Sequence, residues 1–177
     1  MFARLIFALA LLASSAGATT LQQLSVEQMI EQSTAIVRAK VTGSFPANRN
    51  GTIYTYYRLQ VTENLKSTTA ATTEVAVPGG SLGRVMQSVA GAPELRPGVE
   101  YVLFLWTSRS GLTQIIGLSQ GAFDINAKAG GVVLARPAGN EQMLDAAGRV
   151  VVDRGVTLEL TDLRSRIHKL VDREAIR

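Results

Sequence analysis

Residues 46–61 read PANRNGTIYTYYRLQV and contain the pattern that decides the fold. The pair Asn50-Gly51 is typical of a tight turn between antiparallel strands, because both residue types tolerate a positive φ. After this turn the side chains alternate, which predicts a strand with one apolar face made of Ile53, Thr55, Tyr57, Leu59 and Val61. The stretch therefore predicts a turn over 46–51 and the return strand of a β-hairpin.

The first strand of this hairpin is expected upstream of the turn. Ala35, Val37, Ala39 and Val41 lie at alternating positions, as on one face of a strand. Before them, Ser25 followed three residues later by Gln28 matches a capping box, in which each side chain bonds the other residue's backbone. This predicts a short helix that ends near Gln32.

Further strands are predicted downstream, at 74–77, 101–106, 112–118, 122–126 and 132–135. The run YVLFLW at 101–106 is continuously apolar, as in a strand buried on both faces. Residues 19–24, 81–98 and 137–155 show no clear periodicity and are expected to be connecting segments. At the end of the chain, an apolar stripe with the period of a helix predicts a helix over 162–174 with Thr161 as N-cap; its members are Leu163, Ile167, Leu170 and Val171.

These elements together predict a single, mostly β domain. The expected architecture is an OB-like antiparallel barrel of five to seven strands, with a short N-terminal helix and a C-terminal helix.

The first eighteen residues have the layout of a secretory signal peptide. One positive charge at Arg4 precedes the apolar run Leu5–Ala13, and small residues follow up to the A-x-A site at Ala16–Ala18. We expect cleavage after Ala18, or alternatively after Ala16, and a mature domain over 19–177. The predicted location is outside the cytoplasm, in a periplasm or the medium, with no stable insertion into the membrane, because the run is too short to span one.

Composition removes several classes of function. The chain has no cysteine and one histidine, His168, which excludes disulfides, thiolate metal sites and any site that needs two histidines. The net charge of +4 is modest and spread along the chain, unlike that of a nucleic-acid-binding groove. We therefore expect no cofactor, no metal, no nucleic-acid partner and a monomeric protein.

One motif suggests catalysis. Residues 117–121 read GLSQG, the G-x-S-x-G pattern that presents a nucleophilic serine in α/β-hydrolases, and His168 with an upstream aspartate would complete a triad. The context argues against this interpretation, because residues 122–126 alternate like a strand and the chain lacks βα repeats. A serine esterase that uses Ser119 is the least favoured of the functions considered.

A second candidate is the row Tyr54, Tyr56 and Arg58, which alternation places on one face of the return strand. In OB-type barrels the corresponding face binds ligands, and aromatic rings there could stack against sugars. Binding of an envelope carbohydrate is thus an alternative function. The competing interpretation is that tyrosine favours strands in general.

Several phrases are similar to those of a known family. They are STAIVRAKV at 33–41, RLQV at 58–61, NLK at 64–66 and PGVEYVL at 97–103. Over 33–106 the chain resembles the netrin-like modules, and in particular the inhibitory domain of the tissue inhibitors of metalloproteinases.

The resemblance implies an OB-type barrel and a non-catalytic protein-interaction module, whose partner is another exported protein such as a zinc protease. In these inhibitors the amino group and carbonyl of the first mature residue chelate the zinc of the protease. Here that residue falls on Thr19, followed by Thr20. The family fixes this N-terminus with disulfides, which the present chain lacks.

Overall fold

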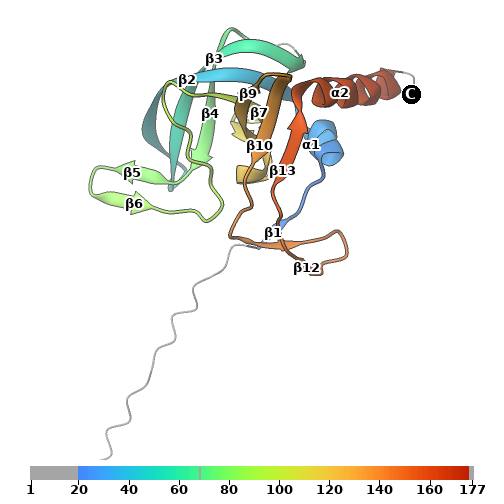
Figure 1. Ribbon diagram of the computed structural model, residues 1–177. Helices are drawn as coiled ribbons and strands as arrows, with labels where there is room; N and C mark the ends of the chain where they lie inside the picture. Colours follow the sequence, from blue (N-terminus) through green and yellow to red (C-terminus); the bar gives the residue numbers. More distant parts are fainter. Residues whose placement is uncertain (1–19, 68, 176–177) are drawn as a thin grey trace, which may run out of the picture.

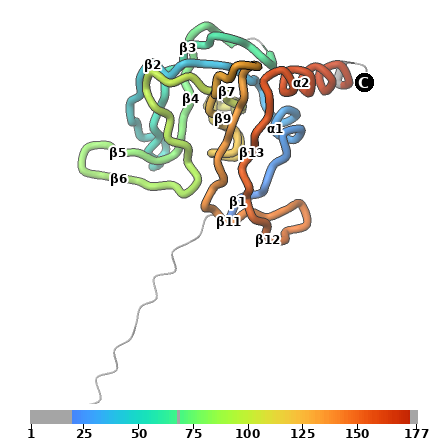
Figure 2. Tube along the Cα trace, in the orientation of Figure 1, coloured from blue at the N-terminus to red at the C-terminus, as the bar shows by residue number. Residues whose placement is uncertain are grey.

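The computed structural model describes residues 20–67 and 69–175 and is mostly β, with 52% of residues in strands (Figures 1 and 2). One antiparallel sheet is strongly curled into a half-barrel, and two helices lie side by side against it. The predicted signal peptide and Thr19 lie outside the described residues. The prediction of a mostly β chain with two helices, one of them C-terminal, is confirmed.

The predicted hairpin consists of β2 (Ala35–Arg49) and β3 (Thr52–Lys66), joined by Asn50 and Gly51 with φ angles of 54° and 84°. The predicted turn over 46–51 is too long, because β2 continues through Pro46, which pairs with Thr55. Proline is tolerated at this point because β2 pairs with β7 only as far as Lys40, so its outer half lies at a sheet edge. Three register shifts between β2 and β3 bend the hairpin and help to curl the sheet.

The large sheet has eight strands, of which seven follow the order β13-β10-β9-β7-β2-β3-β4, while β8 pairs separately with β7. Besides the hairpin they are β4 (Thr72–Pro78), β7 (Glu100–Thr107), β8 (Thr113–Ile115), β9 (Ala122–Lys128), β10 (Gly131–Arg136) and β13 (Val156–Glu159). The strand β8 also contacts β4, so the sheet curls back on itself. The predicted strands are present, although β8 is shorter than the strand predicted over 112–118, and the sheet has one strand more than the five to seven expected.

The central strand β7 is buried on both faces, as the apolar run predicted. Tyr101, Leu103 and Leu105 belong to the core beneath β2, β3 and β4. Val102 and Phe104 point the other way, into a second core that the two helices cover.

The helix α1 (Val26–Gln32) has the predicted capping box, with Ser25 and Gln28 bonded reciprocally. The helix α2 (Leu160–Ala175) begins earlier than predicted, because β13 runs directly into it, so Thr161 lies in the first turn and is not the N-cap. Leu163 and Ile167 are buried as expected, whereas Val171 is 40% exposed and lies outside the core.

Two small sheets occupy segments that were expected to be mostly irregular, and one short helix begins where the strand over 112–118 was predicted to end. The strand β1 (Thr20–Gln22) pairs in parallel with β11 (Gln142–Leu144), which also pairs with β12 (Val150–Val151). The strands β5 (Gly80–Leu82) and β6 (Val85–Gln87) form a hairpin that projects from the body of the molecule (Figure 1). A 3₁₀ helix, η1 (Leu118–Gly121), precedes β9.

Among the described residues, neither helix is both long enough and apolar enough to cross a membrane.

Candidate functional site

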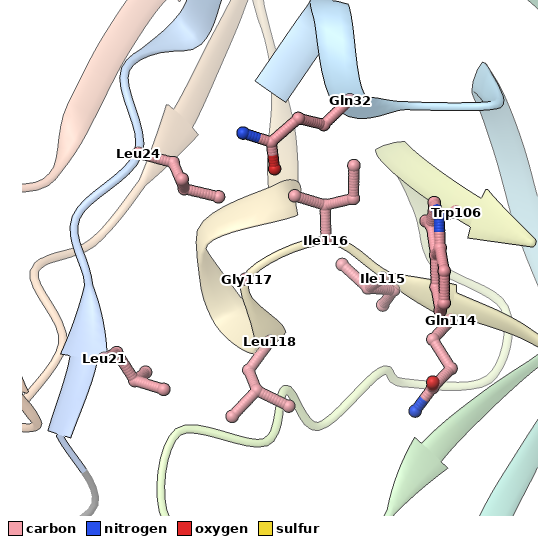
Figure 3. Close-up of a pocket in the computed structure, with 9 residues that line it drawn as sticks. All are labelled: Leu21, Leu24, Gln32, Trp106, Gln114, Ile115, Ile116, Gly117 and Leu118. Atoms are coloured by element: carbon pink, nitrogen blue, oxygen red, sulfur yellow. The ribbon is translucent and has the colours of Figure 1, made fainter. Parts of the chain in front are cut away.

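An apolar groove lies between the N-terminal segment and the end of the large sheet (Figure 3). Its volume is about 540 Å³, and nine residues line it: Leu21, Leu24, Gln32, Trp106, Gln114, Ile115, Ile116, Gly117 and Leu118. None of these side chains is titratable. The groove therefore favours neutral, apolar groups over charged ones.

The wall of the groove opposite the N-terminal segment is built by the end of β7, by β8 and by the chain that follows β8. Trp106 is at the end of β7 and is 44% exposed. Gly117 and Leu118 both have left-handed backbone conformations, with φ angles of 59° and 57°. A Cβ atom on Gly117 would approach Leu24 Cδ1 to 3.2 Å and Gln120 Nε2 to 3.0 Å, so a larger residue would require these side chains to shift, and the left-handed φ also favours glycine.

The buried side chain of Gln120 joins these two walls. It is 1% exposed, its Oε1 accepts a hydrogen bond from Leu24 N at 2.9 Å, and its Nε2 donates to Gln22 O at 3.0 Å. The amide thus bonds one edge of the N-terminal segment in the way that a neighbouring strand would. Its role could not be predicted from sequence, because glutamine is mostly exposed in proteins and its partners are remote in the chain.

The opposite edge of the N-terminal segment is bonded to β11. Thr20 is opposite Gln142 in the register, and Gln23 N donates to Leu144 O at 2.8 Å. The exposed residue Thr20 is therefore fixed in a strand at the start of the described chain. Of the two N-terminal residues predicted to bind a partner, Thr20 lies directly before a residue of the groove, and Thr19 is outside the described residues.

Tyr54, Tyr56 and Arg58 share one face of β3, as predicted, but they are distant in sequence from the groove residues and belong to a different cluster. A fourth member that was not predicted, Phe45, is opposite Tyr56 in the register. The rings of Phe45 and Tyr56 are stacked at 5.4 Å and 11°, and the Arg58 guanidinium lies 4.9 Å from the centre of the Phe45 ring. The Phe45 ring is thus in contact with both Tyr56 and Arg58.

The serine of the GLSQG motif lines a second cavity of about 350 Å³, together with Asp124, Arg136 and Glu141. Its Oγ atom is buried and has no hydrogen-bond partner among the described residues. His168 lies on α2, where it faces Asp172 at 3.4 Å. The residues of the predicted triad are thus not brought together.

A buried ion pair borders this second cavity. Asp153 accepts hydrogen bonds from both terminal nitrogens of Arg136, at 2.6 and 2.9 Å, and its side chain is 1% exposed. The hydrogen bonds from Arg136, with those from the amides of Gly139 and Gly155, lower the pKa of Asp153 to about 2. The pair ties together the two ends of the segment 137–155, which carries β11.

Within residues 20–67 and 69–175, no group of three or more acidic or histidine side chains is arranged to hold a metal ion.

Comparison of the chain with protein-family models, with curated proteins and with solved structures finds no match. The function is therefore argued from the residues and their geometry.

Proposed function

We propose that the chain is an exported, non-catalytic protein-interaction module that binds its partner through the N-terminal segment and the adjoining groove. One observation carries the proposal: Leu21 and Leu24 of the N-terminal segment form a wall of an apolar, uncharged groove. Gln120 and β11 hold this segment in place from its two edges. A surface that is ordered before binding loses less conformational entropy when the partner docks.

The exposed tryptophan in the groove supports a protein partner. Trp106 combines a large, 44% exposed apolar ring with a polar indole N–H, and such residues are enriched at the centres of protein interfaces. Charged residues are depleted at such centres, as they are in the lining of this groove.

The partner we propose is an exported zinc protease. Cleavage of the signal peptide after Ala18 would make Thr19 the first residue, and its amino group and carbonyl would then bind the zinc ion of the protease, as in the tissue inhibitors that the sequence resembles. The pairing of β1 with β11 and the bonds to Gln120 would restrain the N-terminus as disulfides do in that family. On this proposal the curled sheet is an OB-type barrel.

The test compares two forms of the protein, one that begins at Thr19 and one that carries a glycine and a serine before Thr19. Each is assayed for inhibition of exported zinc proteases on casein. The form that begins at Thr19 should inhibit, and the extended form should not, because the extension removes the free amino group at that position. Thr20 is exposed, so both forms should unfold at the same temperature.

Equal inhibition by the two forms would contradict the zinc-binding role of Thr19. Inhibition by neither form of any zinc protease exported by the same organism would contradict the protease as partner.

A further inference from the structure

The two edges of β1 have different surroundings. Gln23 N donates to Leu144 of β11, whereas Gln22 O accepts from the side chain of Gln120. Successive residues of a strand direct their backbone groups to opposite edges. One edge of β1 therefore faces β11, and the other faces η1 and the groove.

Within residues 20–67 and 69–175, part of the second edge has no hydrogen-bond partner. By the same alternation, the backbone N–H and C=O of Thr20 lie on the same edge as those of Gln22, next to the groove residue Leu21. In the order β1-β11-β12, β1 is the outermost strand of its sheet. The amide of Gln120 bonds Gln22 O and Leu24 N on this edge and does not extend to Thr20. Unpaired backbone groups on an edge strand are a template for an added strand.

The groove next to this edge selects for apolar groups. Leu21, Leu118 and Trp106 line it, and no charged side chain does. The amide of Gln32 lies between Leu24 and Ile116 and can bond a backbone group of a bound peptide (Figure 3). A free strand edge beside an apolar cavity is the arrangement by which proteins recognise extended peptides: backbone bonds provide affinity, and the cavity selects a side chain.

We infer that an extended segment of the partner adds to the free edge of β1 as a strand, and that a neutral aliphatic or aromatic side chain of this segment enters the groove. This inference rests on the proposed function and specifies which chemistry the groove recognises. A charged side chain is excluded because no group in the groove would compensate for the loss of its hydration.

The test uses Trp106, the single tryptophan of the chain, as a fluorescent reporter. The probes are capped pentapeptides of the sequence threonine-valine-X-valine-threonine, whose β-branched residues favour an extended backbone. With X as leucine, the peptide should shift the emission of Trp106 to shorter wavelength in a saturable manner. With X as glutamate, binding should be weaker by roughly tenfold or more.

Backbone pairing is tested with two further leucine peptides, each methylated on one of two adjacent backbone nitrogens. One of these N–H groups faces β1 and the other faces away, so one methylation should weaken binding by roughly tenfold while the other leaves it unchanged. Equal affinity of the two methylated peptides would overturn the strand addition.

The groove itself is tested by the variant Leu118→Asp. The matched control is Val150→Asp, which introduces the same charge at an exposed residue of β12. Leu118 has a left-handed φ of 57°, which aspartate adopts more readily than leucine, so the substitution does not strain the backbone. Leu118→Asp should abolish the response to the leucine peptide. Val150 is 64% exposed and outside the groove, and its variant should respond as the wild type does.

An unchanged response of the Leu118→Asp variant would overturn the inference. The inference would also be overturned if decanoate, but not the leucine peptide, shifted the Trp106 emission of the wild type in a saturable manner. That result would assign the groove to acyl chains. The proposed function is judged separately, by the effect of an N-terminal extension on protease inhibition. That effect can be present even if no peptide binds.

Discussion

At the scale of single residues, the side chain of Gln120 bonds the backbone of Leu24 and of Gln22, which precede it in the chain by 96 and 98 positions. Its amide provides one donor and one acceptor, and the N-terminal segment offers the complementary pair, Gln22 O and Leu24 N. An apolar residue of the same size would fill the space but leave both backbone groups without partners. The cost of unpaired buried groups makes Gln120 the residue that fixes the wall of the groove.

Substitution of Gln120 by leucine should therefore destabilise the protein. We expect the free energy of unfolding to fall by about 1–3 kcal/mol, since Gln22 O and Leu24 N lose their partners. Urea unfolding monitored by circular dichroism measures this change. The control Gln60→Leu, on an exposed residue of β3, should have little effect, and a similar loss in both variants would contradict the role of Gln120.

The second residue of consequence is Asp153. Its pKa is lowered from the ordinary value of 3.8 to about 2, chiefly by the hydrogen bonds from Arg136. A lowered pKa in the folded state stabilises the protein at pH values above the unfolded pKa. This contribution, about 2 kcal/mol, is lost as the pH falls from about 4 to about 2.

Urea unfolding of the wild type and of Asp153→Asn over a series of pH values tests this assignment. The difference between the two proteins should be largest above pH 4 and should shrink toward pH 2, where the wild-type carboxylate is protonated. Asp172→Asn, on the exposed face of α2, should follow the wild-type profile. A difference that is independent of pH would show that Asp153 does not act through its charge.

At the scale of secondary-structure elements, the β2–β3 hairpin is stabilised by side chains that face each other across the strands. The ring of Phe45 on β2 stacks on the ring of Tyr56 on β3. The ring centres of Tyr54 and Tyr56 are 6.2 Å apart, and the guanidinium of Arg58 lies over the ring of Phe45. Cross-strand pairs of this kind fix the register of a hairpin. The row that was considered as a carbohydrate platform therefore also contributes contacts within the hairpin.

A double-mutant cycle on Phe45→Ala and Tyr56→Ala should measure this contact directly. The expected interaction energy is about 0.5–1.5 kcal/mol, as for other stacked aromatic pairs. Unfolding of the wild type, of the two single variants and of the double variant provides it. Additive effects would show that the two rings do not interact.

The carbohydrate alternative has a test of its own, the double variant Tyr54→Ala/Tyr56→Ala. Loss of binding to envelope glycans without loss of stability in this variant would support that alternative.

At the scale of the whole molecule, features that depend on local sequence could be predicted and features that depend on remote partners could not. Alternation predicted the hairpin, the capping box predicted α1, and the apolar run predicted a strand buried on both faces. The strand β1 was missed because three residues carry no clear period and their partner β11 is more than a hundred residues away. The ion pair of Arg136 and Asp153 could not be predicted either, because its partners are also separated in the sequence. The curling of the sheet is accompanied by register shifts that no local pattern reveals.

The candidate site was predicted in part. The sequence directed attention to the N-terminus of the mature chain, and Thr20 does lie next to the groove. The groove was not predicted, because its lining comes from four separate segments of the chain. Gln120, which holds one of its walls, has no distinctive spacing from Gln22 and Leu24, the residues that it bonds.

The central claim is that the N-terminal segment is held as a wall of the groove. Amide hydrogen exchange at Leu24 in the protein that begins at Thr19 tests it most directly, because this N–H donates to the buried side chain of Gln120. We expect exchange far slower than in an unfolded chain, together with slow exchange at Gln23, which donates to β11. Exchange of both amides at the rate of an unfolded chain would contradict it.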